Sequence, residues 1–282
     1  MLILAKPLTS YKSQTRTLPS LFELQLSYSQ LPFIPLTPTV NFSSLIFHLH
    51  NMTSLRHLDL SGNNFNSSIP NWLYSFSHLE FLNLGSSNLH GTISSAIGNL
   101  TSASSIDLSG NELGGKLPRS LGNLCNLREI RLSSNKWSQE ISEILESLSV
   151  CVLDRLEILD LSNSQLHGHL TNELDLFKNL ADLVLWNNSI SSPLPLSFGN
   201  LSSLTYLDLE NNQFNKTLPQ NFGQLSKLET LYIDSNMLKG VVSKVHFSNL
   251  TSLRILYASR NQLTLKASQN WIPPFQYESL FL

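Results

Sequence analysis

Four aspartates recur at the same position of the sequence, three in Leu-Asp-Leu and one in Ile-Asp-Leu, and are the first candidates for chemistry: Asp59, Asp107, Asp160 and Asp208. Carboxylates repeated at one position of successive units would form a row, which could bind calcium or act in acid and base catalysis. Other repeats, however, carry unrelated residues at this position, namely Asn83, Arg131, Val184, Tyr232 and Tyr257. Because the row is broken in this way, we expect a protein that is not an enzyme.

Two histidine pairs are the next candidates. His48 and His50 lie two residues apart, and His167 and His169 flank Gly168. Such a pair could bind a metal from one face of a strand, but the sequence implies no third ligand. The chain also has no GxGxxG, GxxxxGK, HExxH or GxSxG motif. We therefore expect histidines in turns, no metal site and no cofactor.

The chain has two cysteines, Cys125 and Cys151, without the CxxC spacing of a zinc site. A disulfide between them could hold the stretch SLSVC against the neighbouring repeat in an oxidising compartment. Two buried free thiols are equally compatible with the sequence. The sequence leaves both alternatives open.

Composition limits the partners and the location of the chain. Charged residues make up 13% of the 282 residues and the formal net charge is -2, which argues against nucleic acid as a partner. The first residues, MLILAKPL, contain a shorter apolar run than a signal peptide, and no apolar stretch reaches the roughly 20 residues that cross a bilayer. The chain shows neither a signal peptide nor a transmembrane helix, and its last residues stop within a repeat. We expect an internal piece of a longer protein.

An internal repeat supplies the elements that position the candidate residues. An apolar residue opens the pattern LxxLxLxxN at Leu21, Leu55, Leu79, Ala103, Leu127, Leu156, Leu180, Leu204, Leu228, Leu253 and Tyr277. From Leu55 onward the spacing is 24 or 25 residues, with one interval of 29. The interval of 34 residues before Leu55 contains a further opener at Leu45, which indicates a shortened coil. A fixed period of this length is typical of a solenoid.

Each repeat predicts a short strand followed by a return segment. In the repeat that opens at Leu204, an alternation of period two turns the leucines inward and Tyr206, Asp208 and Glu210 outward. One coil buries too few leucines to offset its ordering entropy, so neighbouring coils must share a core. Proline in stretches such as GKLP and TLP indicates a turn, and the glycine of SLGNL, SFGNL and NFGQL is predicted to end the helix-like turn that follows.

An asparagine follows the strand at a fixed position of most repeats. These residues are Asn63, Asn111, Asn135, Asn188, Asn212, Asn236 and Asn261, with serine instead at Ser87 and Ser164. A side-chain amide both donates and accepts, so we expect a ladder in which the asparagines satisfy backbone groups and one another.

The predicted fold is an α/β repeat solenoid, curved, with a parallel sheet on its concave face. The array spans residues 18–282 in about ten to eleven coils, with a shortened coil near 45–55 and an insertion near 146–151. Residues 1–17 are expected to form an irregular N-terminal segment.

The repeat, in outline LxxLxLxxNxLxGxIPxxLGN, resembles the plant-specific class of leucine-rich repeat. Longer stretches such as LRHLDLSGNNFNSSIPNWLYS, LEILDLSNSQLHGHLTNELDLFKNL and LTLKASQNWIPPFQYESLFL resemble plant receptor-like proteins of the ethylene-inducing xylanase receptor type. The resemblance covers nearly the whole chain and implies part of an ectodomain.

This resemblance implies a non-catalytic recognition module of a membrane glycoprotein, on the extracellular side of the plasma membrane, that acts in plant defence and signal transduction. The expected partners are a microbial protein, peptide or glycan ligand and, in the full-length protein, a co-receptor kinase. Two alternatives are a secreted leucine-rich repeat inhibitor of cell-wall-degrading enzymes and a nonfunctional gene fragment. An inhibitor would carry cysteine caps at both ends, which this chain lacks.

Eight Asn-x-Ser/Thr sites are candidates for N-glycosylation: Asn41, Asn51, Asn66, Asn99, Asn187, Asn200, Asn215 and Asn249. Four of them, Asn51, Asn99, Asn200 and Asn249, stand four residues before an opener and therefore outside the strand. Glycans there would leave the inner face bare. The alternative is that Asn-Leu is simply part of the repeat, as Asn123 in NLC indicates.

Ligand binding in a repeat array depends on the side chains that the repeat leaves free. The predicted ligand-binding residues are Asp182, Val184, Trp186, Tyr206, Asp208, Glu210, Tyr232, Asp234 and Tyr257. Exposed aromatic residues interleaved with acids are typical of an interaction surface. The alternative is that the aromatic residues only stabilise neighbouring strands.

Overall fold

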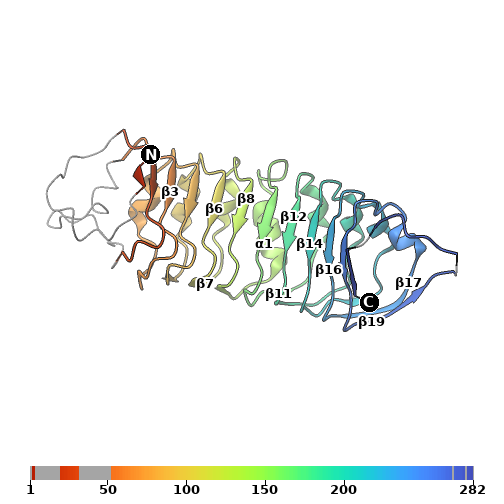
Figure 1. Ribbon diagram of the computed structural model, residues 1–282. Coiled ribbons are helices and arrows are strands. Elements are labelled where there is room, and N and C mark those ends of the chain that lie inside the picture. Colours follow the sequence, from red (N-terminus) through yellow and green to blue (C-terminus); the bar gives the residue numbers. More distant parts are fainter. Residues whose placement is uncertain (1, 4–19, 32–51, 269, 277, 282) are drawn as a thin grey trace. The chain divides into compact units, whose positions relative to one another are not determined.

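The structure is a computed structural model that describes residues 2–3, 20–31, 52–268, 270–276 and 278–281. The opener at Tyr277, most of the shortened coil, both His48 and His50, and the candidate sites Asn41 and Asn51 lie outside the described residues. The chain divides into two compact units, Met1–Trp137 and Ser138–Leu282. In each unit, short strands and short helices alternate along the chain (Figure 1).

The main sheet of the first unit is parallel, and each strand follows its predecessor by one coil. Its strands are β1 (Leu2–Ile3), β2 (Glu23–Gln25), β3 (His57–Asp59), β4 (Phe81–Asn83), β6 (Ser105–Asp107) and β8 (Glu129–Arg131), in that order. Leu24 of β2 pairs directly with Leu58 of β3. Leu2 pairs with Leu24, so residues 2–3 form a strand within the segment predicted to be irregular. This pairing occupies an edge of β2 that would otherwise present free backbone groups.

The main sheet of the second unit repeats the same arrangement. Its strands are β10 (Ile158–Asp160), β12 (Asp182–Val184), β14 (Tyr206–Asp208), β16 (Thr230–Tyr232), β18 (Ile255–Tyr257) and β20 (Ser279–Phe281). The central leucines pair in register, as Leu183 does with Leu207 and Leu207 with Leu231. The predicted parallel sheet of a repeat solenoid is confirmed.

The return path of each coil combines a short strand with a short 3-10 helix. In the first unit these are β5 (His90–Gly91), β7 (Glu112–Gly115), β9 (Lys136–Trp137), η3 (Asn71–Ser75), η4 (Ser95–Asn99) and η5 (Arg119–Asn123). In the second unit they are β11 (His167–Gly168), β13 (Ser189–Ile190), β15 (Asn215–Lys216), β17 (Met237–Ser243), β19 (Gln262–Lys266), η6 (Asn172–Leu176), η7 (Leu196–Asn200), η8 (Gln220–Gln224) and η9 (Lys244–Phe247).

The longest coil contains the α-helix α1 (Ile141–Leu148) where the other coils have a 3-10 helix. Its apolar residues recur at helical spacing, and Ile141, Ile144, Leu145 and Leu148 are buried. The extra residues predicted near 146–151 are therefore the end of this helix and the turn that follows it. No helix in the described part of the chain is both long and apolar enough to span a bilayer.

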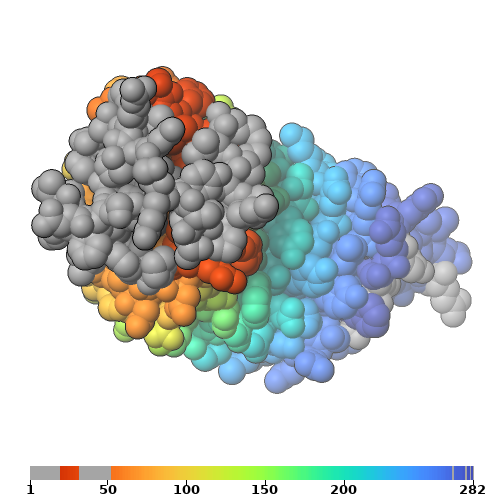
Figure 2. Space-filling model, turned by 60° about the vertical axis from the view of Figure 1, so that its left-hand side comes forward, coloured from red at the N-terminus to blue at the C-terminus, as the bar shows by residue number. Residues whose placement is uncertain are grey.

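The core consists of the inward leucines of successive coils. Leu204, Leu207, Leu209 and Phe214 are each no more than 1% exposed, and the openers Leu180 and Leu228 are fully buried. A fully buried leucine contributes about 2 kcal/mol, and the neighbouring coil supplies the surface that buries it. Figure 2 shows the coils of the second unit as successive bands from teal to blue, each lying against the next.

The asparagine ladder is confirmed in its bonds to backbone groups but not in the expected bonds between asparagines. The Asn212 amide nitrogen donates to the backbone carbonyls of Leu185 (2.9 Å), Leu209 (3.3 Å) and Glu210 (3.1 Å), and its oxygen accepts from the N–H of Ile190 (3.1 Å). The bonds thus join two coils through backbone groups. The expectation that these asparagines also bond one another is wrong, because four backbone groups already use the amide.

A second ladder of side-chain amides does exist, one residue before the first. Asn187 donates to Asn163, and Asn211 donates to Asn187. Asn163, Asn187 and Asn211 all have positive φ, between 49° and 54°. Asparagine tolerates this left-handed conformation better than most residues, which explains its repeated use at this turn.

The glycines of the return segments do not end the 3-10 helices, so that prediction is wrong. Gly199 and Gly223 lie within η7 and η8, and neither has positive φ. A Cβ atom on Gly223 would lie 2.4 Å from the carbonyl oxygen of Val245, and one on Gly199 would lie 2.6 Å from that of Asn221. Glycine is needed there because the helices of adjacent coils pack closely.

Candidate functional site

The outward side chains of strands β12, β14, β16, β18 and β20 form one surface, which we call the β12–β20 face. It consists of the predicted ligand-binding residues Asp182, Val184, Trp186, Tyr206, Asp208, Glu210, Tyr232, Asp234 and Tyr257, together with Phe281. One row runs from Val184 through Asp208, Tyr232 and Tyr257 to Phe281, each paired with the next in register. The structure thus brings the predicted residues together on one face.

The remaining residues of the face form two further rows, one on each side of the first. Asp182 pairs with Tyr206, and Tyr206 pairs with Thr230. Beyond the strand ends, the N–H of Asn187 donates to the carbonyl of Glu210 (2.9 Å), and the N–H of Asn211 donates to that of Asp234 (3.2 Å). Trp186, Glu210 and Asp234, which lie next to these bonds, therefore occupy equivalent positions in adjacent coils.

Aromatic rings on this face contact one another across four strands. The ring centroids are 5.9 Å apart for Tyr206 and Tyr232, 5.1 Å for Tyr232 and Tyr257, and 4.6 Å for Tyr257 and Phe281. Phe281 is 52% exposed and was not among the predicted residues, although it follows Tyr257 by 24 positions. The repeat period alone could have identified it. Trp186, at 38% exposed, extends the face beyond the rings.

The recurring aspartates have a structural task in most coils. Asp107 Oδ1 accepts hydrogen bonds from the N–H (2.8 Å) and the hydroxyl (2.6 Å) of Ser109. The pairs Asp59 with Ser61 and Asp160 with Ser162 repeat this arrangement. The bonds close a turn after the strand. In these three coils the aspartate therefore holds the turn through the serine two residues later.

Asp208 differs from the other aspartates because its partner is an acid. Its Oδ1 accepts the N–H of Glu210 (3.0 Å), and the hydroxyl that hydrogen-bonds its carboxylate comes from Tyr206 instead of from a serine. Asp208 is only 7% exposed. Burial, together with the negative charges of Glu210 and Asp234, raises the pKa of Asp208 from 3.8 to about 6.

Glu210 and Asp234 complete a cluster of three carboxylates, which we call the acidic cluster. Burial raises the pKa of Glu210, as do the charge of Asp234 and a carboxyl-to-carboxyl contact with it, while Arg260 acts in the opposite direction. Two carboxyl groups can share a hydrogen bond only if one of them keeps a proton. Asp234 is 8% exposed, and its Oδ1 is buried without a hydrogen-bond partner.

The acidic cluster also lacks ion pairs. Ion pairs among the described residues include those of Arg56 with Glu80, Arg131 with Glu129, Lys136 with Glu112 and Arg254 with Glu278. None of them includes Asp208, Glu210 or Asp234. Burial also raises the pKa values of the neighbouring phenols Tyr206 and Tyr232, so these rings remain neutral beside the acids.

The remaining predicted sites are spread over the surface. Asn66, Asn99, Asn200 and Asn249 are exposed, whereas Asn187 and Asn215 are partly buried. His167 and His169 are both exposed, and no group of three potential metal ligands occurs among the described residues. Neither Cys125 nor Cys151 is a free thiol.

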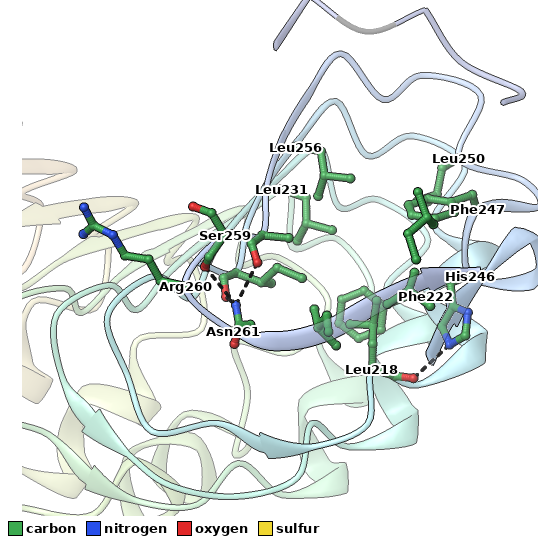
Figure 3. Close-up of a pocket in the computed structure, with 15 residues that line it drawn as sticks. Leu218, Phe222, Leu231, His246, Phe247, Leu250, Leu256, Ser259, Arg260 and Asn261 are labelled. Atoms are coloured by element: carbon green, nitrogen blue, oxygen red, sulfur yellow. Dashed lines mark hydrogen bonds between the residues drawn. The ribbon is translucent and has the colours of Figure 1, made fainter. Parts of the chain in front are cut away.

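An apolar cavity of about 180 Å³ lies behind the sheet in the second unit (Figure 3). Leu231 and Leu256 line it from the strands, and Phe247 and Leu250 line it from η9 and the turn that follows. The buried His246 uses its Nε2 atom in a contact with the carbonyl of Leu218 (3.1 Å). The cavity is lined by the leucine core of the last coils and does not belong to the β12–β20 face.

Comparison with known proteins identifies the repeat. A family model described as "Leucine rich repeat" matches residues 178–238 and 218–263, and a second of the same description matches residues 54–76, 78–100 and 102–124. Together these matches span just over half of the chain. A stretch of 45 residues is 51% identical to "Receptor-like protein EIX1" of Solanum lycopersicum, and it covers 16% of this chain and 4% of that protein.

Solved structures of plant receptors share the fold. The structure of a TDR receptor has a TM-score of 0.80 and 27% identity, and the match covers 93% of this chain and 43% of that one. The ectodomain of the Arabidopsis receptor kinase HAESA, solved with an N-terminal extended IDA peptide hormone, has a TM-score of 0.71 and 27% identity over 82% of this chain and 40% of that one. This chain spans less than half the length of these solved chains. From its repeats, its stacked parallel strands and these matches, we conclude that the chain belongs to the leucine-rich repeat family and has the fold of plant receptor ectodomains.

Proposed function

We propose that the chain is part of the ligand-recognition ectodomain of a plant cell-surface receptor-like protein of the ethylene-inducing xylanase receptor type. In this proposal the β12–β20 face is the concave face and binds a microbial protein, peptide or glycan elicitor. A co-receptor kinase is the partner of the longer protein, which acts in defence signalling at the plasma membrane. The proposal involves no catalysis by this chain.

The observation that carries the proposal is the composition of the β12–β20 face. Four aromatic rings lie in contact along Tyr206, Tyr232, Tyr257 and Phe281, next to carboxylates without ion-pair partners. Aromatic residues are enriched among the residues that dominate the energy of protein interfaces. The HAESA structure, which contains a peptide hormone, supports a peptide as one class of ligand.

A selection from a phage-displayed library of random peptides tests the proposal on the full chain. We expect peptides whose affinity falls by about tenfold or more when Trp186 and Tyr232 are both replaced by alanine, because each replacement removes a large contact surface. Leu196→Ala is the matched control, because Leu196 is 68% exposed but belongs to η7 instead of the sheet. Selected peptides that bind the Trp186→Ala/Tyr232→Ala variant as well as the original chain would contradict the proposal.

We also propose that Cys125 and Cys151 form one disulfide and that the exposed Asn66, Asn99, Asn200 and Asn249 carry N-linked glycans. Both modifications require passage through an oxidising secretory compartment. Peptide mapping by mass spectrometry of protein secreted from plant cells, with and without reduction, measures both. Free thiols, or unmodified asparagine at all four sites, would contradict the respective assignment.

A further inference from the structure

The acidic cluster carries more negative charge than its surroundings balance. Asp208, Glu210 and Asp234 lie on adjacent coils, and Asp208 and Asp234 are more than nine-tenths buried. Buried charges in proteins are normally paired, because the desolvation of a lone carboxylate is costly. Arg260 is the cation whose charge reaches Glu210, but it is exposed and forms none of the ion pairs of the described residues. In Figure 3 its side chain extends away from the apolar residues.

One oxygen of the acidic cluster, Asp234 Oδ1, lacks a hydrogen-bond donor. Asp234 Oδ1 is buried and accepts no hydrogen bond, whereas Oδ1 of Asp107 and Oδ1 of Asp160 each accept bonds from a serine. At the equivalent position of earlier coils, the hydroxyls of Ser109 and Ser162 donate to an aspartate. A buried acceptor without a donor costs about 1–3 kcal/mol. A ligand that brings a donor to this atom would recover that free energy.

The aromatic rings next to the cluster favour a cation as this donor. The rings of Tyr206 and Tyr232 are 5.9 Å apart, and both phenols interact electrostatically with the Asp208 carboxylate. Faces of tyrosine and tryptophan rings attract ammonium and guanidinium groups. A guanidinium group also has five N–H donors, enough to reach more than one carboxylate.

We propose that the β12–β20 face binds an arginine or lysine side chain of a peptide ligand, with Asp208, Glu210 and Asp234 as the carboxylate subsite and the tyrosine rings beside it. This inference rests on the proposed function and narrows the ligand to a basic peptide segment. On binding, the cation pairs with Glu210 and Asp234 and donates to Asp234 Oδ1.

The test uses the full chain and two synthetic probes, acetyl-(Gly-Arg)4-amide and its neutral citrulline analogue. Citrulline keeps the shape of arginine but has no charge, so the difference in affinity reports the cation. We expect the arginine probe to bind about tenfold tighter than the analogue at physiological salt. In the Glu210→Gln/Asp234→Asn variant the two affinities should converge. Asp59→Asn/Asp107→Asn is the matched control, because it removes the same charge from aspartates that already have serine donors, and it should keep the tenfold preference.

The pH dependence of binding gives a second readout. The groups that face the cluster are Asp182, Asp208, Glu210, Asp234, Tyr206, Tyr232 and Arg260. Because the pKa of Asp208 lies near 6 and that of Glu210 is raised, the arginine probe should bind more weakly at pH 5 than at pH 7.5. The citrulline analogue should show no such change.

Several results would overturn the inference. One is equal affinity for the two probes, and another is an arginine preference that survives Glu210→Gln/Asp234→Asn. Stabilisation of the chain by Ca²⁺ alone that is lost in this variant would assign the carboxylates to a metal and overturn it as well. If neutral peptides from the display selection still require Trp186 and Tyr232, only this inference fails. If no ligand depends on the β12–β20 face, the proposed function fails with it.

Discussion

Replacement of Asp208 by asparagine should change the stability of the chain in a pH-dependent way. The native pKa of Asp208 is about 6, and its value before burial is 3.8. Since the native protein holds the proton more tightly, Asp208 favours the folded state at low pH. This contribution is fully present below about pH 4 and is lost as the pH rises through about 6. A shift of about two units corresponds to about 3 kcal/mol at pH 8, at roughly 1.4 kcal/mol per unit.

Asparagine at position 208 removes the pH-dependent contribution to stability but keeps the local hydrogen bond. Its Oδ1 can accept the N–H of Glu210 as the carboxylate does now, at 3.0 Å. We therefore expect Asp208→Asn to unfold at nearly the same urea concentration as the original chain at pH 4. At pH 8 the variant should be more stable, by up to about 3 kcal/mol. Urea unfolding followed by circular dichroism at both pH values measures the difference.

Asp107→Asn provides the matched comparison in a coil with serine at the following position. Asp107 accepts two hydrogen bonds from Ser109, so the loss of its charge weakens the turn. This variant should be slightly less stable than the original chain at pH 8. If Asp208→Asn were also less stable at pH 8, or if its effect were the same at both pH values, the account of Asp208 as a destabilising buried charge would be refuted.

Two further substitutions test the framework. Asn212→Ala leaves the N–H of Ile190 without a partner and removes one of the two amide donors to the carbonyl of Leu185. This should cost about 1–3 kcal/mol in urea unfolding, whereas Asn211→Ala on the exposed ladder should cost less than about 0.5 kcal/mol. Equal losses would refute the role of the inner ladder. Gly223→Ala would place a Cβ 2.4 Å from the carbonyl oxygen of Val245. We therefore expect a lower melting temperature and a free energy of unfolding that is smaller by about 1–3 kcal/mol. Gln224→Ala, at an exposed position of the same helix, should change little. An unchanged melting temperature for Gly223→Ala would show that the helices of adjacent coils are not tightly packed there.

The sequence predicts the stacking of the strands and leucines well, because every coil must bury its leucines against its neighbours. A single strand and its leucines are unstable alone, so the period of 24 residues fixes which leucines must stack. Leu183, Leu207 and Leu231 pair as this argument requires. The same period places Val184, Asp208, Tyr232 and Tyr257 in one row, since side chains of in-register parallel strands align.

Contacts that depend on three-dimensional distance are harder to predict from the period. The sequence shows that Asn212 recurs, but the geometry of the turn decides that its amide reaches four backbone groups. Similarly, the glycine of SFGNL and NFGQL is visible in the sequence, but the close approach of adjacent helices is not. The raised pKa of Asp208 depends on its burial, and burial of a polar residue on an outward face leaves no periodic signal.

The β12–β20 face lies in the coils that lack the hydrogen-bonded pair of aspartate and serine after the strand. In the coils of Asp107 and Asp160, aspartate and serine close the turn after the strand. The same two positions hold Val184 and Trp186, then Asp208 and Glu210, then Tyr232 and Asp234 in three successive coils. These coils keep their turns without the pair because Asn188, Asn212 and Asn236 still bond the backbone of the preceding coil. The asparagine ladder thus frees the outward positions from a structural role, and a carboxylate can be retained there even though it destabilises the unliganded chain. Residues that lower the stability of the fold and have no structural role in it are expected to serve binding.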